Sequence, residues 1–140
     1  MKPETIEQLF GTLVECSAAA WKKHLKTSNR NKHEDLNDFY EDMPELVDTL
    51  IEAYQGLFGK VEGYENLLAD ASEMTALEFL DELHEICKEG RDLLQGETEL
   101  ESDMDAILDL ISSTVYKLRE MDEVHPRTNE SLADFLGRVL

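Results

Sequence analysis

The sequence predicts an all-α fold: one four-helix bundle domain over residues 1–140, with a long connection between the second and third helices and a short C-terminal helix. Apolar residues recur every three or four positions in four segments, which is the spacing of helices with one buried face. Capping motifs and polar turns separate these segments. A chain of 140 residues is also long enough for a single core of helix-bundle size.

The first helix is expected from about Pro3 to about Thr27, because proline is tolerated in the first turn of a helix. His24 lies on its apolar stripe, where it is either a metal ligand that faces inward or a hydrogen-bonded core histidine. The helix itself leaves both interpretations open. The stripe comprises Ile6, Leu9, Phe10, Leu13, Val14, Ser17, Ala20, Trp21, His24 and Leu25.

The second helix is expected over residues 33–58, after a polar turn in which Asn31 and Glu34 resemble a capping box. So short a turn makes the first two helices antiparallel neighbours. It therefore brings His24, at the end of one helix, close to His33, at the start of the next.

Pro44 lies inside the second helix, where its missing N–H and its ring predict a bend at residues 40–43 or a break. Gly56 and Gly59 mark the end of this helix. Residues 60–74 form the long connection, which a short helix is expected to interrupt.

The third helix is expected to begin after Thr75, which forms a capping box with Glu78, and to run to about Gln95. Asp81 and His84 share one face of it. This Asp-x-x-His spacing is similar to the Glu-x-x-His of di-iron bundles, but the further glutamates of such a site are not evident.

The fourth helix is expected to start at a capping box opened by Thr98 and to end before a loop at His125 and Pro126. Residues 129–140 predict the short terminal helix. Acidic residues crowd the first half of the fourth helix, either as a solvated face near a helix N-terminus or as the lining of an entry pore for cations. They are Glu99, Glu101, Asp103, Asp105 and Asp109.

The net charge of −19 is unevenly distributed. Residues 1–32 hold six basic and three acidic side chains, whereas residues 33–140 hold seven basic and 29 acidic ones. A surface this acidic repels nucleic acid and attracts cations. The basic cluster near the first turn is either a phosphate-binding patch or a set of cations that complements a helix dipole. It consists of Lys22, Lys23, Lys26, Arg30 and Lys32.

The sequence contains no long uncharged apolar run, so we expect neither a membrane span nor a secretory signal, and we expect a cytoplasmic location. Cys16 and Cys87 are far apart in sequence, and each falls within a helical pattern. They are therefore expected to be buried free thiols.

Asp48 and Glu52 stand one helical turn apart on the second helix, and His33 lies about 60° from Asp48 around the helix axis. Imidazole and carboxylate together form a ligand set for a transition metal. Yet His33 lies about 22 Å from Asp48 along the axis, so the two cannot share a metal within one chain. A two-fold axis near residues 41–42 would place His33 of one copy level with Asp48 and Glu52 of the other.

This block of residues resembles Dps, the mini-ferritins of the ferritin-like superfamily. His33 followed by Glu34, and Asp48 with Glu52, match the family's motifs at the family's own interval, while the shorter interval from His24 to His33 predicts a shortened turn. The resemblance implies a ferritin-like bundle and a ferroxidase or iron-storage function. Its implied metal-binding and catalytic residues are His24, His33, Asp48 and Glu52, with iron as the metal and oxygen or peroxide as the oxidant.

The resemblance also implies a homo-oligomer, at least a two-fold dimer and up to a dodecameric cage. Direct DNA binding is not expected, because no lysine-rich tail precedes the first helix.

The same block resembles small phage-encoded proteins whose activity is unknown. The alternative to the enzyme is an acidic helical adaptor or inhibitor that binds a basic protein partner, for example by mimicking nucleic acid. In favour of the enzyme, we expect the apolar neighbours of Asp48 to shield its carboxylate, which would then need a partner.

Overall fold

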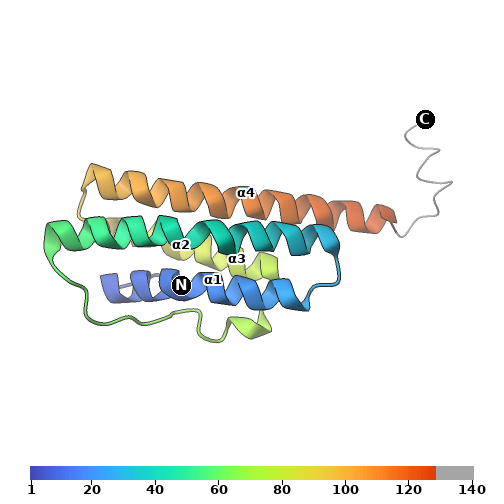
Figure 1. Cartoon of the computed structure of the whole chain (residues 1–140), viewed down its shortest axis with the longest axis horizontal. Coiled ribbons are helices and arrows are strands. Elements are labelled where there is room, and N and C mark those ends of the chain that lie inside the picture. The colour runs from blue at the N-terminus through green and yellow to red at the C-terminus, as the bar shows by residue number, and fades with distance from the viewer. Residues whose placement is uncertain (129–140) are drawn as a thin grey trace.

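The computed structural model describes the backbone of residues 1–128 and the side chains of residues 1–120. Within residues 1–128, four helices form a bundle (Figure 1), so the predicted all-α fold is confirmed. The terminal helix expected over residues 129–140 lies outside the described residues. The helices are α1 (Ile6–Lys26), α2 (Arg30–Phe58), α3 (Ala76–Glu89) and α4 (Thr98–Thr128), with 3-10 turns η1 (Ala71–Glu73) and η2 (Gly90–Leu94).

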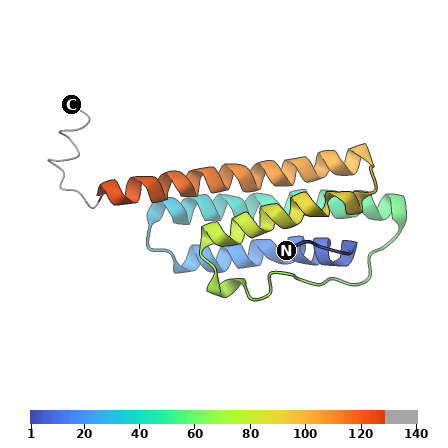
Figure 2. The same ribbon diagram turned by 180° about the vertical axis from the view of Figure 1, so that it is seen from behind.

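The long connection between α2 and α3 sets the topology of the bundle. Residues 59–75 run back along α1, so that α2 and α3 point in the same direction while α1 and α4 point the other way (Figures 1 and 2). α1 packs against α2 and α3, and α4 packs against the same two helices. The centre of the bundle is apolar, and its largest fully buried side chains include Phe10, Phe39, Phe79, Leu13, Met43 and Leu83.

The connection is attached to α1 by hydrogen bonds from its backbone N–H groups that the sequence does not reveal. The Glu65 N–H donates to the Glu7 carbonyl at 3.1 Å, and the Leu67 N–H donates to Thr12 Oγ1 at 2.9 Å. Gly11 permits this approach, because a Cβ at this position would lie 2.3 Å from the Glu65 backbone nitrogen.

Two of the predicted helix starts are wrong. α2 begins one residue after Asn29, whose side chain accepts from the Lys32 N–H, so Asn31 lies inside the helix and is not its cap. α4 begins at Thr98, and the carbonyl before it, that of Glu97, accepts from the Glu101 N–H, so Thr98 is likewise not a cap. In both places another polar residue close in sequence, Asn29 or Glu97, occupies the position of the predicted cap.

The start of α3 is confirmed, with Thr75 and Glu78 forming both hydrogen bonds of a capping box. Its end was predicted too late. α3 stops at Glu89, where the chain tightens into η2, and Gln95 then adopts a left-handed conformation.

α2 runs unbroken through Pro44, so the predicted alternative of a helix break is wrong. The pyrrolidine ring lies on the exposed side of the helix, while Met43 and Val47 are buried on either side of it. Burial of these neighbours stabilises the helix against the loss of one backbone hydrogen bond. The loop expected at His125 and Pro126 is also absent, because α4 continues to Thr128.

No helix within residues 1–128 is long and apolar enough to cross a membrane. Cys16 and Cys87 are both buried and free, as predicted. Burial raises the pKa of the Cys16 thiol to about 12, and burial also raises the pKa of Cys87.

Candidate metal-binding site

His24 and His33 meet where α1 turns into α2. His24 lies in the last turn of α1 and is 6% exposed, and His33 lies in the first turn of α2. Only Thr27, Ser28 and Asn29 separate the two helices, as the short interval between the histidines predicted. The two imidazole rings stack with their centroids 3.6 Å apart and their planes tilted by 35°.

One hydrogen bond fixes the orientation of the His33 ring. Its Nδ1 lies 3.1 Å from the backbone carbonyl of His24, and a carbonyl can only accept, so Nδ1 donates. In the neutral ring the lone pair therefore lies on Nε2. This backbone anchoring of one ring nitrogen is the arrangement by which proteins orient a metal-binding histidine.

The His24 ring has a buried nitrogen without a partner. Its Nδ1 accepts and donates no hydrogen bond among the described residues. Tyr40 lies against this ring edge-on, at 5.2 Å between centroids, but its hydroxyl donates to Asn37 Oδ1. An unsatisfied buried polar atom costs about 1–3 kcal/mol, so His24 is a group for which a further ligand would be favourable.

Asp48 and Glu52 lie together on the outer side of α2, and both side chains are exposed. They border an open groove of about 510 Å³ between α1, α2 and the connection. No basic side chain within the described part of the chain forms an ion pair with either carboxylate. The groove also contains apolar side chains, which include the half-exposed Val14 and Tyr64. Its lining is Leu13, Val14, Ser17, Pro44, Val47, Asp48, Ile51, Glu52, Gln55 and Tyr64.

The expectation that apolar neighbours shield Asp48 is wrong. Val47, Leu50 and Ile51 are buried and face the core. At 100° per residue, Asp48 is turned about 100° from the Val47 side chain and Glu52 about 140° from it. Both carboxylates therefore face water in the single chain.

The single chain brings the four predicted ligands together as two separate pairs. The 15 residues from His33 to Asp48 lie within the continuous helix α2, which corresponds to about 22 Å along its axis. Within the residues that the structure describes, no group of three or more His, Cys, Asp or Glu side chains is placed to hold a metal ion. A site that uses all four ligands requires a second copy of the chain.

Two of the other acidic candidates, Asp81 and Asp105, have basic partners among the described residues. Arg119 donates to both carboxylate oxygens of Asp81, at 3.2 and 3.3 Å, beside His84 in a shallow groove. Arg91 donates to the carboxylate of Asp105 on α4, and this hydrogen bond lowers the pKa of Asp105. Arg119 therefore occupies both carboxylate oxygens of Asp81, and Arg91 occupies one carboxylate oxygen of Asp105.

Residues 24–118 match the model of DUF5856, a family of unknown function. The chain belongs to the DUF5856 family. The matched region covers more than half of the 140 residues and contains His24, His33, Asp48 and Glu52. No curated protein and no solved structure matches the chain, and no match to a ferritin or to Dps is found.

Proposed function

We propose that this DUF5856 protein is a cytoplasmic iron-binding ferroxidase and iron-storage protein of the Dps type, with a metal site shared between two copies of the chain. The observation that carries the proposal is the arrangement of the ligands on α1 and α2. His24 and His33 form a stacked pair at one end, and Asp48 with Glu52 form an exposed pair farther along α2 that has no ion-pair partner among the described residues. Imidazole nitrogen and carboxylate oxygen together form a common ligand set for transition metals, and each pair supplies one of these two ligand types.

A two-fold axis would bring the two halves together. If two α2 helices run antiparallel across an axis near Glu41 and Asp42, His33 of one copy lies level with the carboxylates of the other. The unbroken course of α2 through Pro44 supports this geometry, since a broken helix would not keep the register between the two ends. The half-exposed side chains of the groove beside Asp48 would supply apolar area to bury between the copies.

The ligand chemistry suits ferrous iron, which is the substrate. His33 would offer Nε2, because its Nδ1 is bound to the His24 carbonyl, and the carboxylates would offer oxygen atoms that also hold the ferric product. Each ferrous ion loses one electron. Hydrogen peroxide takes two electrons and two protons to give two waters, so one peroxide oxidises two ferrous ions. The net charge of −19 would raise the local concentration of cations near the protein.

The test is the rate of Fe(II) oxidation by peroxide or oxygen. We expect the protein to oxidise Fe(II) faster than buffer does, and His33→Ala and Glu52→Ala each to remove the acceleration. Glu62→Ala is the matched control, because it removes one exposed carboxylate from the connection and should keep the parent rate. Equal rates in parent, His33→Ala and Glu52→Ala would refute the proposal.

The second candidate function is a non-enzymatic acidic adaptor or inhibitor that binds a basic protein. The exposure of Asp48 and Glu52 favours it, since two unpaired carboxylates beside apolar side chains could receive a basic partner. Native mass separates the two candidates. A closed assembly of many copies favours the ferroxidase, whereas a monomer that binds no Fe(II) favours the adaptor.

A further inference from the structure

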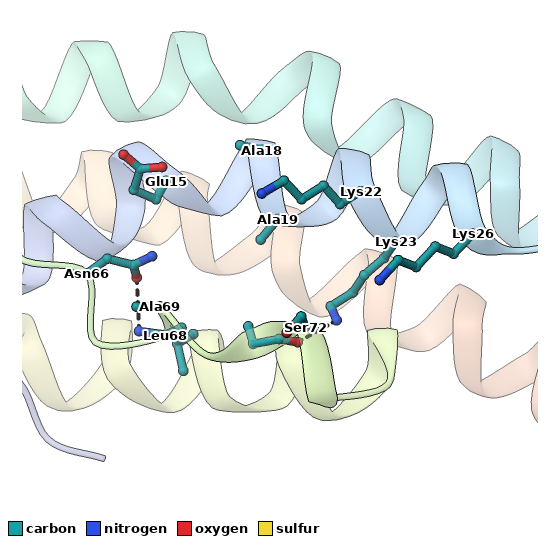
Figure 3. A pocket seen from close by; sticks show the side chains of 11 residues that line it. Glu15, Ala18, Ala19, Lys22, Lys23, Lys26, Asn66, Leu68, Ala69 and Ser72 are labelled. Atoms are coloured by element: carbon teal, nitrogen blue, oxygen red, sulfur yellow. Dashed lines mark hydrogen bonds between the residues drawn. The ribbon is translucent and has the colours of Figure 1, made fainter.

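A second groove lies between α1 and the long connection, and none of the four candidate metal ligands lines it. Figure 3 shows it from close by. Its volume is about 230 Å³. Small side chains of α1 form one wall and leave the groove accessible. Three lysines line one end and make that end basic. The residues that matter here are Ala18, Ala19, Lys22, Lys23, Lys26 and Ser72.

Lys23 builds the basic end of this groove. Its Nζ donates to the backbone carbonyls of Ala71 at 2.7 Å and of Met74 at 2.6 Å, which holds the η1 turn against α1. Burial lowers the pKa of Lys23, and the positive charge of Lys26 lowers it further. The negative charge of Glu78 acts in the opposite direction and raises the pKa of Lys23.

Lys22 and Lys26 are the two lysines free to receive a ligand. They are one helical turn apart on α1, both are exposed, and neither forms an ion pair within the described part of the chain. In Figure 3 both side chains extend back along α1 toward the groove, and Glu15 lies at the opposite end. Two ammonium groups and the Ser72 hydroxyl thus border one small space.

We propose that this groove binds a compact anion that carries a phosphate group. The groove is smaller than the pockets of about 300–1,000 Å³ that enclose drug-sized ligands, so a phosphate group is a suitable occupant. Lysine ammonium groups bind phosphate oxygens through charge-assisted hydrogen bonds. DNA is a poor candidate, because residues 33–140 carry 29 acidic against seven basic side chains and would repel an extended polyanion.

The experiment is calorimetric titration of the full chain with inorganic phosphate and with pyrophosphate at low ionic strength, where exposed charges are least screened. We expect saturable binding with a dissociation constant at or below about 1 mM. Lys22→Gln combined with Lys26→Gln should weaken binding at least tenfold. Lys60→Gln combined with Lys88→Gln removes the same charge from exposed positions outside the groove and should leave binding unchanged.

A steric variant separates a site from a general attraction of anions. Ala18→Leu keeps every charge and fills part of the groove from an exposed position, so it should also weaken phosphate binding at least tenfold. Circular dichroism spectra should show that all variants keep the parent's helix content. The proposal is overturned if phosphate does not bind saturably, if Ala18→Leu and the Lys22/Lys26 variant bind like the parent, or if a DNA duplex binds and phosphate does not.

Discussion

Gly11 gives the sharpest test of how the long connection is held. An alanine Cβ at this position would lie 2.3 Å from the Glu65 nitrogen and 2.5 Å from its carbonyl oxygen, so the connection has to move away from α1. Overpacking of this kind costs about 1–3 kcal/mol. Two hydrogen bonds beside it, from the Glu65 N–H to the Glu7 carbonyl and from the Leu67 N–H to Thr12 Oγ1, contribute about 0.5–1.5 kcal/mol each and would be weakened. The helix gains about 1 kcal/mol when glycine becomes alanine.

The net expectation for Gly11→Ala is a loss of about 2–4 kcal/mol in the free energy of unfolding. Urea denaturation followed by circular dichroism measures it. Gly56→Ala is the matched control, because Gly56 also lies within a helix but a Cβ there would meet nothing within 4 Å. The same substitution at this position should stabilise the protein by about 0.5–1 kcal/mol. If Gly11→Ala is as stable as the parent, the connection does not contact α1 in this way.

Three further predictions concern charged and buried groups. Lys23→Met removes two hydrogen bonds to backbone carbonyls and should destabilise the protein by about 1–3 kcal/mol in urea denaturation, whereas Lys22→Met at an exposed position should change stability by less than about 0.5 kcal/mol. Arg91 lowers the pKa of Asp105, so this pair stabilises the fold above the ordinary carboxyl pKa, and the contribution is lost as pH falls through the lowered value. NMR titration of Asp105 should show that pKa rising to its ordinary value in Arg91→Gln; an unchanged value would contradict the ion pair. Cys16, whose pKa is raised to about 12 by burial, should react with a thiol reagent only after unfolding, and rapid reaction of the folded protein would refute its burial.

The helices could be predicted from the sequence because their periodicity is strong and local. Phe39, Met43, Val47 and Leu50 recur at helical spacing, and all four are buried in α2. The exact helix starts could not be predicted as well, because several polar residues near a turn compete for the cap. Asn29 forms the cap of α2, although Asn31, two residues later, belongs to the more familiar sequence motif.

The exposed orientation of Asp48 could have been predicted from the sequence. The buried residues Val47, Leu50, Ile51 and Tyr54 centre on one direction of the helix, and Asp48 lies about 100° from it. Apolar neighbours in sequence do not make apolar surroundings in space, because consecutive residues of a helix point about 100° apart. The contact between Gly11 and Glu65, by contrast, joins segments 54 residues apart, and no local pattern predicts it.

The proximity of His24 and His33 was predictable because a short turn between antiparallel helices leaves little choice. The sharing of their metal with Asp48 and Glu52 of a second copy is a different kind of prediction. It depends on an interface between two copies of the chain. The structure of a single copy contains the histidine pair and the carboxylate pair, but not the interface that would join them.

Complementation between inactive variants tests this shared site most directly. A chain with His33→Ala keeps its carboxylates, and a chain with Glu52→Ala keeps its histidines, so a mixed dimer contains one complete site and one doubly defective site. Random mixing of equal amounts by co-expression should restore about a quarter of the parent's sites, and with them about a quarter of its Fe(II) oxidation rate. Each variant measured separately should be inactive. A mixture as inactive as its separate components would contradict a site built from two copies of the chain.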